Sequence, residues 1–150
     1  MVETVLLYLE QDGKYLMLYR NKKKKDINKG KWIGIGGHIE EGETKEEALV
    51  RECKEETSLN LLSYSLRGKL VFVIDGYEET CYLYTSSSFE GKIQECDEGE
   101  LAFVNKEEIF HLPLWEGDVI FLKMLLNDEP YFELRLNYEK DKLISYEREM

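Results

Sequence analysis

Three glutamates, Glu52, Glu55 and Glu56, follow a glycine pair, Gly36-Gly37, at the spacings i, i+3 and i+4. If this stretch is helical, the three carboxylates project from one flank, where like charges repel each other by roughly a few tenths of a kcal/mol per i,i+4 pair. Hard cations such as Mg²⁺ prefer carboxylate and carbonyl oxygens, which one helix and one nearby loop would supply together. The pattern therefore predicts a divalent-metal site, and the alternative is an ordinary solvated helix face.

A helix over residues 44–57 is expected to carry these glutamates. Thr44 and Glu47 match the capping box, in which each side chain bonds the other residue's backbone N–H. At the helical period the glutamates form an arc beside an apolar arc that would face the core. That apolar arc consists of Leu49, Val50 and Cys53. The helix would thus bury one flank and present carboxylates from the next.

Strand-forming segments lie on both sides of this helix. Turns are expected at Asp12-Gly13, at Asp75-Gly76 and over residues 139–141, and an amphipathic helix over residues 116–127. The predicted strands cover residues 2–9, 15–20, 67–75, 79–89, 99–105, 131–138 and 142–147, with an extended segment at 32–37. This order predicts a mixed α/β (α+β) fold in which a β-sheet is sandwiched between helices.

The composition fits one domain over residues 1–150, with 43% hydrophobic residues available for a core. A net charge of −11 argues against a nucleic acid polymer or a membrane surface as partner, since both select a basic face. A small polyanion is compatible, because a bound divalent metal reverses the local field. The sequence shows neither a signal peptide nor a membrane-spanning run, so a cytoplasmic protein is expected.

The cysteines and histidines offer little chemistry of their own. Cys53, Cys81 and Cys96 form no CxxC pair, which argues against zinc and disulfides and for ordinary reduced thiols. His38 and His111 are the two histidines, too few for a histidine-rich metal site or a catalytic triad. His38 is expected in a loop rather than on the metal, because Mg²⁺ prefers oxygen.

The segment around the glutamates resembles the signature of the Nudix family, G-x5-E-x7-R-E-U-x-E-E-x-G-U, in which U is aliphatic. The chain fills these positions, correctly spaced, with Gly37, Glu43, Arg51-Glu52, Cys53, Glu55-Glu56, Ser58 and Leu59. Cys53 replaces an aliphatic residue and behaves as a small hydrophobe when buried. Ser58 replaces a glycine that would cap the helix in the left-handed conformation, which should cost about 1 kcal/mol of stability.

The resemblance implies a Nudix fold and the hydrolysis, dependent on Mg²⁺ or Mn²⁺, of a nucleoside diphosphate linked to another group. The metal ligands that it implies are Glu52, Glu55, Glu56 and the backbone carbonyl of Gly36. Arg51 would orient the glutamates through a salt bridge with Glu43. A glutamate would take the proton of the attacking water, and the sequence leaves Glu55 and Glu98 both open for this role.

Outside the signature, the chain is similar to the MutT-type branch of the family, which hydrolyses oxidised purine nucleoside triphosphates such as 8-oxo-dGTP. "GKWIGIGGHIEEGET" resembles the branch's path into the signature, and "ECDEGEL" resembles its acidic loop, with Glu98 as an additional metal ligand or base. "LPLWEGD" resembles its base-recognition segment, which would put Trp115 against the purine face and Asp118 at the purine edge. Without the resemblance, Trp115 would be a core or lid aromatic, and Asp118 an acid that favours the helix dipole.

One position departs from that branch. A relative that removes oxidised nucleotides has an asparagine, whose amide helps to read the base, where this chain has Ile33. Isoleucine cannot hydrogen-bond, so base recognition is expected to differ here or to be looser.

Four further residues are expected to line the substrate site. Gly36 and Gly37 allow a close approach of the backbone. Arg20 resembles a basic position that contacts substrate, and the alternative is a surface salt bridge. Thr4 resembles a position in the base pocket, and the alternative is an ordinary strand threonine. The lysines at 22–25 are expected to form a solvated loop.

Three hypotheses about function remain. In the first, the protein cleaves an oxidised or ordinary purine nucleoside triphosphate to monophosphate and pyrophosphate. The second keeps the reaction and changes the substrate to ADP-ribose, a dinucleoside polyphosphate or, against the net charge, a triphosphorylated RNA end. The third is a nucleotide-sensing domain without turnover, which the complete set of signature glutamates disfavours. The sequence does not indicate an oligomeric state.

Overall fold

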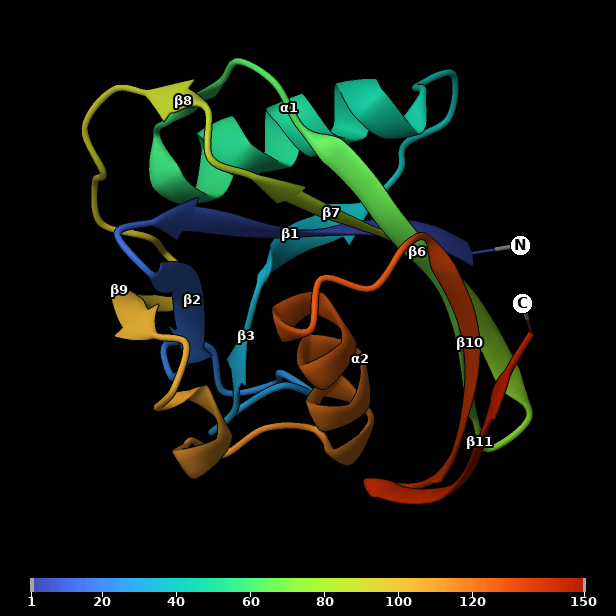
Figure 1. Ribbon diagram of the computed structural model, residues 1–150. Helices are drawn as coiled ribbons and strands as arrows, with labels where there is room; N and C mark the ends of the chain where they lie inside the picture. Colours follow the sequence, from blue (N-terminus) through green and yellow to red (C-terminus); the bar gives the residue numbers. More distant parts are fainter. Residues whose placement is uncertain (1, 150) are drawn as a thin grey trace.

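The computed structural model describes residues 2–149 and contains a mixed sheet with a helix on each side (Figure 1). In Figure 1, α1 (Lys45–Thr57) lies above the sheet and α2 (Glu116–Leu126) lies below it. The other elements are β1 (Val2–Gln11), β2 (Lys14–Arg20), β3 (Trp32–Ile33), β4 (Ile35–His38), β5 (Asn60–Leu61), β6 (Ser65–Ile74), β7 (Tyr77–Ser86), β8 (Phe89–Glu90), β9 (Gly99–Asn105), the 3-10 helix Ile109–His111, β10 (Phe132–Glu139) and β11 (Lys142–Arg148). The predicted sheet between helices is confirmed.

The main sheet has the strand order β11-β10-β6-β7-β1-β2-β3, with β4 paired to β1 and β9 paired to β2. Strand β1 runs parallel to β7, and β10 runs parallel to β6, whereas the other pairs of this sheet are antiparallel. Both Asp-Gly turns form as predicted, with positive φ at Asp12, Gly13, Asp75 and Gly76. The small pair of β5 with β8 was not predicted from the sequence.

Residues 32–37, predicted as one extended segment, are divided between β3 and β4 at Gly34. A Cβ at Gly34 would lie 2.8 Å from the carbonyl oxygen of Leu7, so a glycine lets the chain cross β1 closely. Strand β3 then pairs with β2, and β4 pairs with β1. This change of partner brings the glycine pair Gly36-Gly37 against the middle of β1.

Strand β1 separates two hydrophobic clusters because successive side chains point to opposite faces of a strand. Val5, Leu7 and Leu9 are buried in the cluster that packs against α1, whereas Tyr8 is buried in the cluster around α2. Each fully buried side chain of this size contributes about 1.5–3 kcal/mol of burial free energy. Packing against the two faces of the sheet therefore fixes the positions of both helices relative to β1 and β4.

Candidate active site

Helix α1 begins and ends as the sequence predicts. The backbone N–H of Glu47 donates to Thr44 Oγ1 over 3.0 Å, and that of Thr44 donates to Glu47 Oε1 over 2.9 Å, which completes the capping box. At the C-terminal end, Ser58 has φ 70° and its N–H donates to the carbonyl of Lys54. Serine thus occupies the left-handed conformation in which a glycine was expected.

The buried face of α1 includes one of the glutamates. Leu49 and Cys53 are buried as predicted, together with Ala48 and Glu56. The prediction for Val50 is wrong, because this side chain is 41% exposed. Thr57, on the last turn, is buried as well, while Val50, about 100° from Leu49, lies at the outer edge of the buried face.

Glu56 is the most deeply buried of the helix glutamates, with 6% of its surface exposed. The backbone N–H of Gly36 donates to its Oε1 over 2.9 Å, while its Oε2 is buried and has no hydrogen-bond partner among the described residues. The pKa of this carboxyl is raised to about 9, mainly by burial and also by the charges of Glu98 and Glu52, while the hydrogen bond from Gly36 opposes the shift. An unpartnered buried carboxylate oxygen needs a ligand, a proton or a water.

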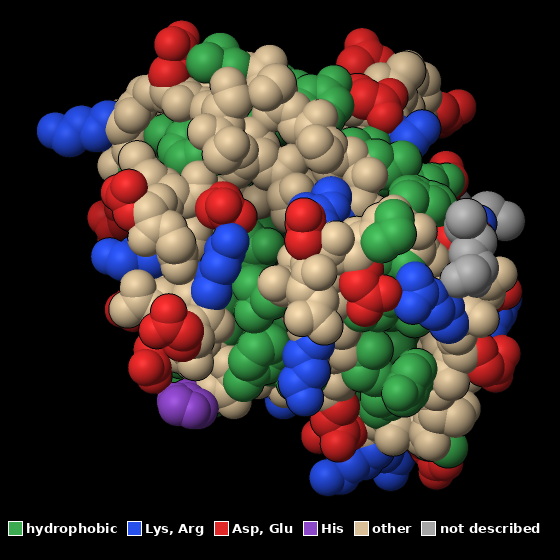
Figure 2. Space-filling model, in the orientation of Figure 1, with side chains coloured by type: hydrophobic (Ala, Val, Ile, Leu, Met, Phe, Trp, Pro, Cys, Tyr) green, Lys and Arg blue, Asp and Glu red, His purple; other side chains and the backbone are tan. Residues whose placement is uncertain are grey.

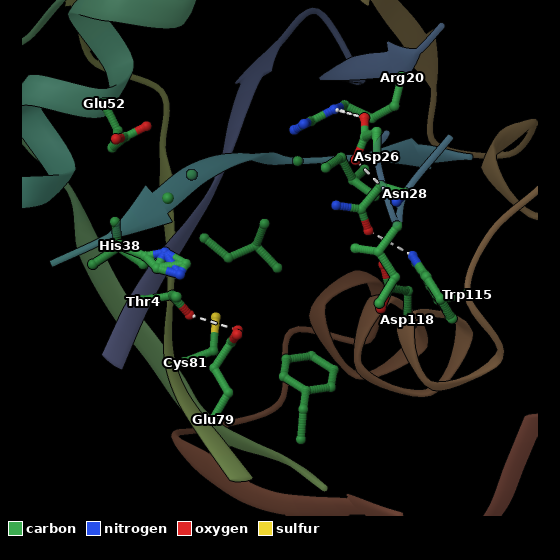
Figure 3. Close-up of a pocket in the computed structure, with 18 of the residues that line it drawn as sticks. Thr4, Arg20, Asp26, Asn28, His38, Glu52, Glu79, Cys81, Trp115 and Asp118 are labelled. Carbon is green, nitrogen blue, oxygen red and sulfur yellow. Dashed lines mark hydrogen bonds and ion pairs between the residues drawn. The ribbon is translucent and has the colours of Figure 1, made fainter. Parts of the chain in front are cut away.

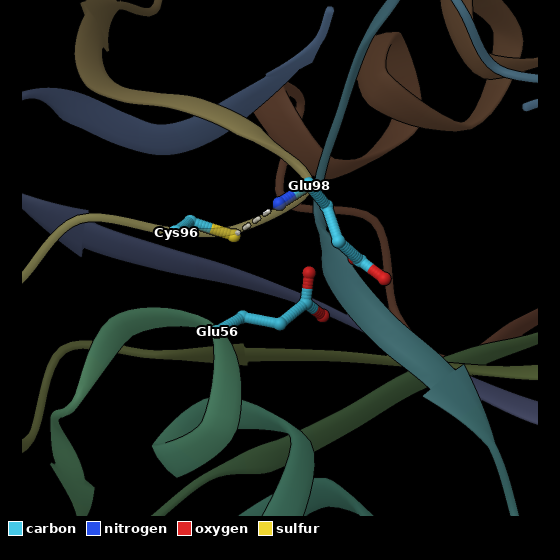
Figure 4. A group of neighbouring side chains, drawn as sticks. All are labelled: Glu56, Cys96 and Glu98. Carbon is cyan, nitrogen blue, oxygen red and sulfur yellow. Dashed lines mark hydrogen bonds between the residues drawn. The ribbon is translucent and has the colours of Figure 1, made fainter. Parts of the chain in front are cut away.

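The loop before β9 brings two more groups to Glu56 (Figure 4). One ligand atom each from Glu56, Cys96 and Glu98 lie within 4.8 Å of one another. Glu98 also pairs with Arg20 at 3.2 Å and with Lys23 at 3.4 Å. The sequence predicts Glu98 here, but it treats Cys96 as an ordinary thiol, since the signal for its position is only its spacing of two from Glu98.

Arg51 holds the remaining signature carboxylates in place. It binds Glu43 with two N–H groups, at 2.7 and 2.9 Å, and Glu52 and Glu55 with a third nitrogen, at 2.8 and 3.3 Å. It also donates to the carbonyl of His38 over 3.0 Å. The hydrogen bonds from Arg51 lower the pKa of Glu43 to about 2, and the same contacts raise the pKa of Arg51. The predicted salt bridge between Arg51 and Glu43 is present.

The glycine pair is required by close contacts on both sides. A Cβ at Gly37 would lie 2.5 Å from the carboxyl carbon of Glu52, and one at Gly36 would collide with the carbonyl oxygen of Val5. Glu52 therefore rests directly on the backbone of β4, and its burial raises the pKa of its carboxyl although Arg51 opposes this. The pair allows α1 and β4 to approach closely enough for Glu52 and Glu56 to contact the backbone of β4.

This donor set fits a divalent cation. Glu56 and Glu98 each supply a carboxylate oxygen to the cluster, and Oε2 of Glu56 is buried without a hydrogen-bond partner among the described residues. Glu52 lies beside them with a side chain that is 14% exposed, whereas the side chain of Glu55 is 57% exposed, and both are bound to Arg51. Among the predicted ligands, the structure thus brings Glu56 and Glu98 together most closely. Glu52 lies next to them, and Glu55 lies further out, toward solvent.

A pocket of about 820 Å³ opens next to these carboxylates. Figure 3 shows Glu52 and His38 on one side of it and Asn28, Trp115 and Asp118 on the opposite side. Its lining includes each residue predicted to bind substrate, namely Thr4, Arg20, Gly36, Gly37, Trp115 and Asp118. We call the part around Glu52, Glu56 and Glu98 the glutamate end, and the part around Asn28, Trp115 and Asp118 the tryptophan end. The volume suits one nucleotide.

At the tryptophan end, Trp115 is held from several sides. Its Nε1 donates to Asn28 Oδ1 over 2.8 Å, the ring of Tyr138 meets it edge-on at 5.7 Å, and Lys31 Nζ lies 5.1 Å from its ring centre. Asp118 is 6% exposed and accepts no side-chain hydrogen bond from the described residues. Burial raises the pKa of Asp118 to about 7, while the charge of Lys31 opposes this.

The polar residues of the pocket wall that sequence reasoning missed include Asp26, Asn28 and Glu79. Asp26 and Asn28 belong to a loop that was predicted as exposed, and Asp26 Oδ1 accepts from the backbone N–H of Asn28 over 3.0 Å. This is an Asx-type turn, which the D-x-N spacing could have indicated. Glu79 accepts from Thr4 Oγ1 over 3.0 Å, and no local pattern marks that contact between β1 and β7.

The surface carries both signs of charge. On the face drawn in Figure 2, lysine and arginine side chains are interspersed with aspartate and glutamate. Within residues 2–149, no helix is long and apolar enough to cross a membrane.

Comparison with known proteins assigns the family. The model of the NUDIX domain matches residues 2–125, so the chain belongs to the Nudix hydrolase family and is an enzyme of that class. Hydrolases of this family generally use a divalent metal, which agrees with the carboxylate cluster.

Individual relatives share about a quarter of their residues with this chain. It is 28% identical to the Bacillus subtilis (strain 168) protein named "Uncharacterized Nudix hydrolase YvcI", covering 92% of this chain and 88% of that one. It is 27% identical to the Danio rerio "Oxidized purine nucleoside triphosphate hydrolase", covering 84% and 80%. It is 26% identical to the Escherichia coli (strain K12) "CTP pyrophosphohydrolase", covering 84% and 92%.

A solved structure agrees over the whole fold. The crystal structure of the MutT protein from Bacillus halodurans superposes with a TM-score of 0.88 at 26% identity, covering 99% of this chain and 98% of that one. The chain is therefore similar to MutT proteins in its fold, and its relatives are named for more than one nucleotide substrate.

Proposed function

We propose that this protein is a Mg²⁺-dependent nucleoside triphosphate pyrophosphohydrolase that prefers purine, and in particular oxidised purine, nucleotides such as 8-oxo-dGTP. The observation that carries the proposal is one nucleotide-sized pocket with carboxylates at one end and Trp115 with Asp118 at the other. The products would be a nucleoside monophosphate and pyrophosphate. Mn²⁺ would serve as an alternative metal, because it accepts the same oxygen ligands.

The glutamate end would hold the metal through Glu52, Glu56 and Glu98, with Gly36 and Glu55 adjacent. Bound there, the ion would neutralise phosphate charge and lower the pKa of a bound water. We assign the proton acceptor to Glu98, since Glu98 lines the pocket and Glu55 does not. Arg51 and Glu43 would act by positioning the helix glutamates.

The tryptophan end would hold the base. An aromatic face stacks a base with about 1–3 kcal/mol. The Asp118 carboxylate would accept N–H groups from the purine edge, and a base without them would leave a buried polar group unpaired. The relative named for oxidised purine nucleoside triphosphates supports a purine substrate. Because another relative is named for CTP, a pyrimidine nucleotide should be tested beside the purines.

The three cysteines are free and buried thiols, which supports a reducing compartment such as the cytoplasm. A nucleotide is the partner that the pocket supports.

The test is a pyrophosphate-release assay with Mg²⁺ that compares 8-oxo-dGTP, dGTP and CTP at low concentration. We expect release from both purines, faster from 8-oxo-dGTP, and its loss in EDTA and in Glu52→Gln. Equal rates for the two purines would make the protein a general purine nucleotide hydrolase. The proposal is overturned if no purine triphosphate yields pyrophosphate. ADP-ribose, which gives AMP and ribose phosphate without pyrophosphate, and dinucleoside polyphosphates would then be the substrates to test, and tight nucleotide binding without turnover would indicate a sensor.

A further inference from the structure

The orientation of the Asn28 amide is fixed by its neighbour. An asparagine amide presents an oxygen that accepts and an NH₂ group that donates, and the two ends have nearly the same shape. The indole of Trp115 can only donate, and its Nε1 lies 2.8 Å from Asn28 Oδ1. The oxygen must therefore face Trp115, which leaves the NH₂ group pointing away from it.

The loop that carries Asn28 is tied down on its other side. Asp26 accepts from Arg20 Nε over 2.7 Å with one oxygen and from the backbone N–H of Asn28 over 3.0 Å with the other. The N–H of Gly30 donates to the carbonyl of Arg20 over 2.8 Å. Both the backbone and the side chain of Asn28 are thus held in place. A ligand that binds Asn28 therefore loses little free energy to the ordering of this loop.

The free NH₂ group faces the pocket. Asn28 lines the pocket, and in Figure 3 its amide nitrogen points into the space between Glu52 and Trp115. The described residues offer this NH₂ group no hydrogen-bond acceptor. Asp118, on the same side of the pocket, is an acceptor when ionised. The tryptophan end therefore presents a donor and an acceptor beside a flat aromatic ring.

Purine bases differ in the groups that they offer to this arrangement. A 6-oxopurine has a carbonyl acceptor at C6 next to N–H donors, whereas a 6-aminopurine has an NH₂ donor at C6 next to acceptor nitrogens. A donor from Asn28 together with an ionised Asp118 matches the first pattern. Ile33, on the neighbouring wall, contributes no hydrogen bond of its own.

We propose that Asn28 determines base specificity by donating its amide N–H to the C6 carbonyl of a 6-oxopurine nucleotide. This inference rests on the proposed function, which supplies a purine nucleotide as the ligand. It adds that the same site selects 6-oxopurines over 6-aminopurines. It also explains how a chain with Ile33 reads a base, since the donor comes from the loop rather than from β3.

The sharpest variant is Asn28→Asp. Aspartate keeps an oxygen to accept from Trp115 and the size of the side chain, but it replaces the NH₂ donor by a second acceptor. We expect the ratio of kcat/KM for dGTP over dATP to fall at least about tenfold, the size of one lost hydrogen bond to a base. dITP keeps the C6 carbonyl and lacks the 2-amino group. Its kcat/KM should therefore fall in Asn28→Asp by the same factor as that of dGTP.

Two controls separate charge from recognition. Asn60→Asp makes the same chemical change at an exposed position of β5 and should leave the ratio unchanged. Asn28→Ala removes the donor without adding charge and should also lower the ratio. The inference is overturned if Asn28→Asp and Asn28→Ala keep the wild-type ratio, or if dITP behaves like dATP in the wild-type protein.

A binding measurement distinguishes this inference from the proposed reaction. Calorimetric titration of the metal-free protein with dGMP and dAMP should give tighter binding of dGMP, reduced in Asn28→Asp. If that holds while no triphosphate releases pyrophosphate, the base reading stands and the reaction fails. If pyrophosphate is released but dGMP and dAMP bind wild type and Asn28→Asp alike, the inference fails and the reaction stands.

Discussion

At the glutamate end of the pocket, most of the carboxyl groups other than Glu56 take part in a network of ion pairs, whereas the tryptophan end has one buried carboxyl, Asp118, that accepts no side-chain hydrogen bond from residues 2–149. At the first end, Arg51 alone contacts Glu43, Glu52 and Glu55. At the second, Asp118 has only the more distant charge of Lys31 to offset its burial. The two carboxyl groups with the strongest upward shifts, Glu56 and Asp118, therefore serve different ends of the pocket.

The difference indicates that the two ends of the pocket have separate roles. Fixed charges that need no rearrangement suit the phosphates and their metal, because preorganised groups lower a barrier without reorganisation. A carboxyl whose pKa lies near neutrality, beside a ring, suits a base that binds through shape and hydrogen bonds. Changes at the glutamate end should therefore alter kcat, and changes at the tryptophan end should alter KM and base preference.

The largest effect is expected from Glu56→Gln. Glutamine keeps an oxygen for the N–H of Gly36, so the fold should persist, but its amide cannot give up a proton to offer a metal a negatively charged ligand at the buried Oε2 position. We expect kcat to fall about 10³-fold with little change in KM, measured by pyrophosphate release. Glu107→Gln, the same change at an exposed position, is the control. A large rise in KM with unchanged kcat would break the comparison.

Asp118→Asn tests the other end. We expect KM for the purine triphosphate to rise about 10²-fold with kcat nearly unchanged, since the base loses its acceptor. A fall in kcat at saturating nucleotide would place Asp118 in the chemistry and contradict these separate roles.

The same variant has a pH signature. The pKa of Asp118 is raised to about 7 in the folded protein, so the folded state holds this proton more tightly than the unfolded chain. The stability that this gives is full below about pH 4 and is lost as pH rises to about 7. Denaturant unfolding should therefore show Asp118→Asn gaining roughly 2–4 kcal/mol over wild type between pH 4 and pH 8. A constant difference across this range would mean that Asp118 ionises normally.

Arg51→Lys should have a moderate effect at the glutamate end. Lysine keeps the charge but lacks the planar donors that bind Glu43 twice while reaching Glu52. We expect kcat to fall about tenfold, with KM changed much less. Arg135→Lys, at a surface ion pair of β10, is the matched control. Equal activity in both variants would show that the network does not position the glutamates.

The smallest change is Ser58→Gly, which touches neither end. Ser58 occupies the left-handed conformation at φ 70°, which disfavours residues with a Cβ. Glycine there should raise the free energy of unfolding by about 1 kcal/mol in urea titrations. Activity should stay within about twofold of wild type. A lost activity would mean that the end of α1 is coupled to the carboxylates.

Much of the glutamate end could be predicted from the sequence because its geometry is local. The capping box, the i, i+3 and i+4 spacing and the Gly36-Gly37 pair lie within about twenty residues. Helical periodicity alone then places Glu52, Glu55 and Glu56 on one flank. The Asp-Gly turns and the alternating strands were predictable for the same reason, and the confirmed turns lie at Asp12 and Asp75.

The sequence by itself thus determined the helix, its carboxylates, most of the strands with their hairpin turns, and the family. Only the tertiary structure decided that Val50 is exposed, that Cys96 lies beside Glu56, and that Asn28 meets Trp115 from 87 positions away. The physical reason is that such contacts depend on the strand order and on the path of two loops. These follow from the packing of the whole chain rather than from any local period.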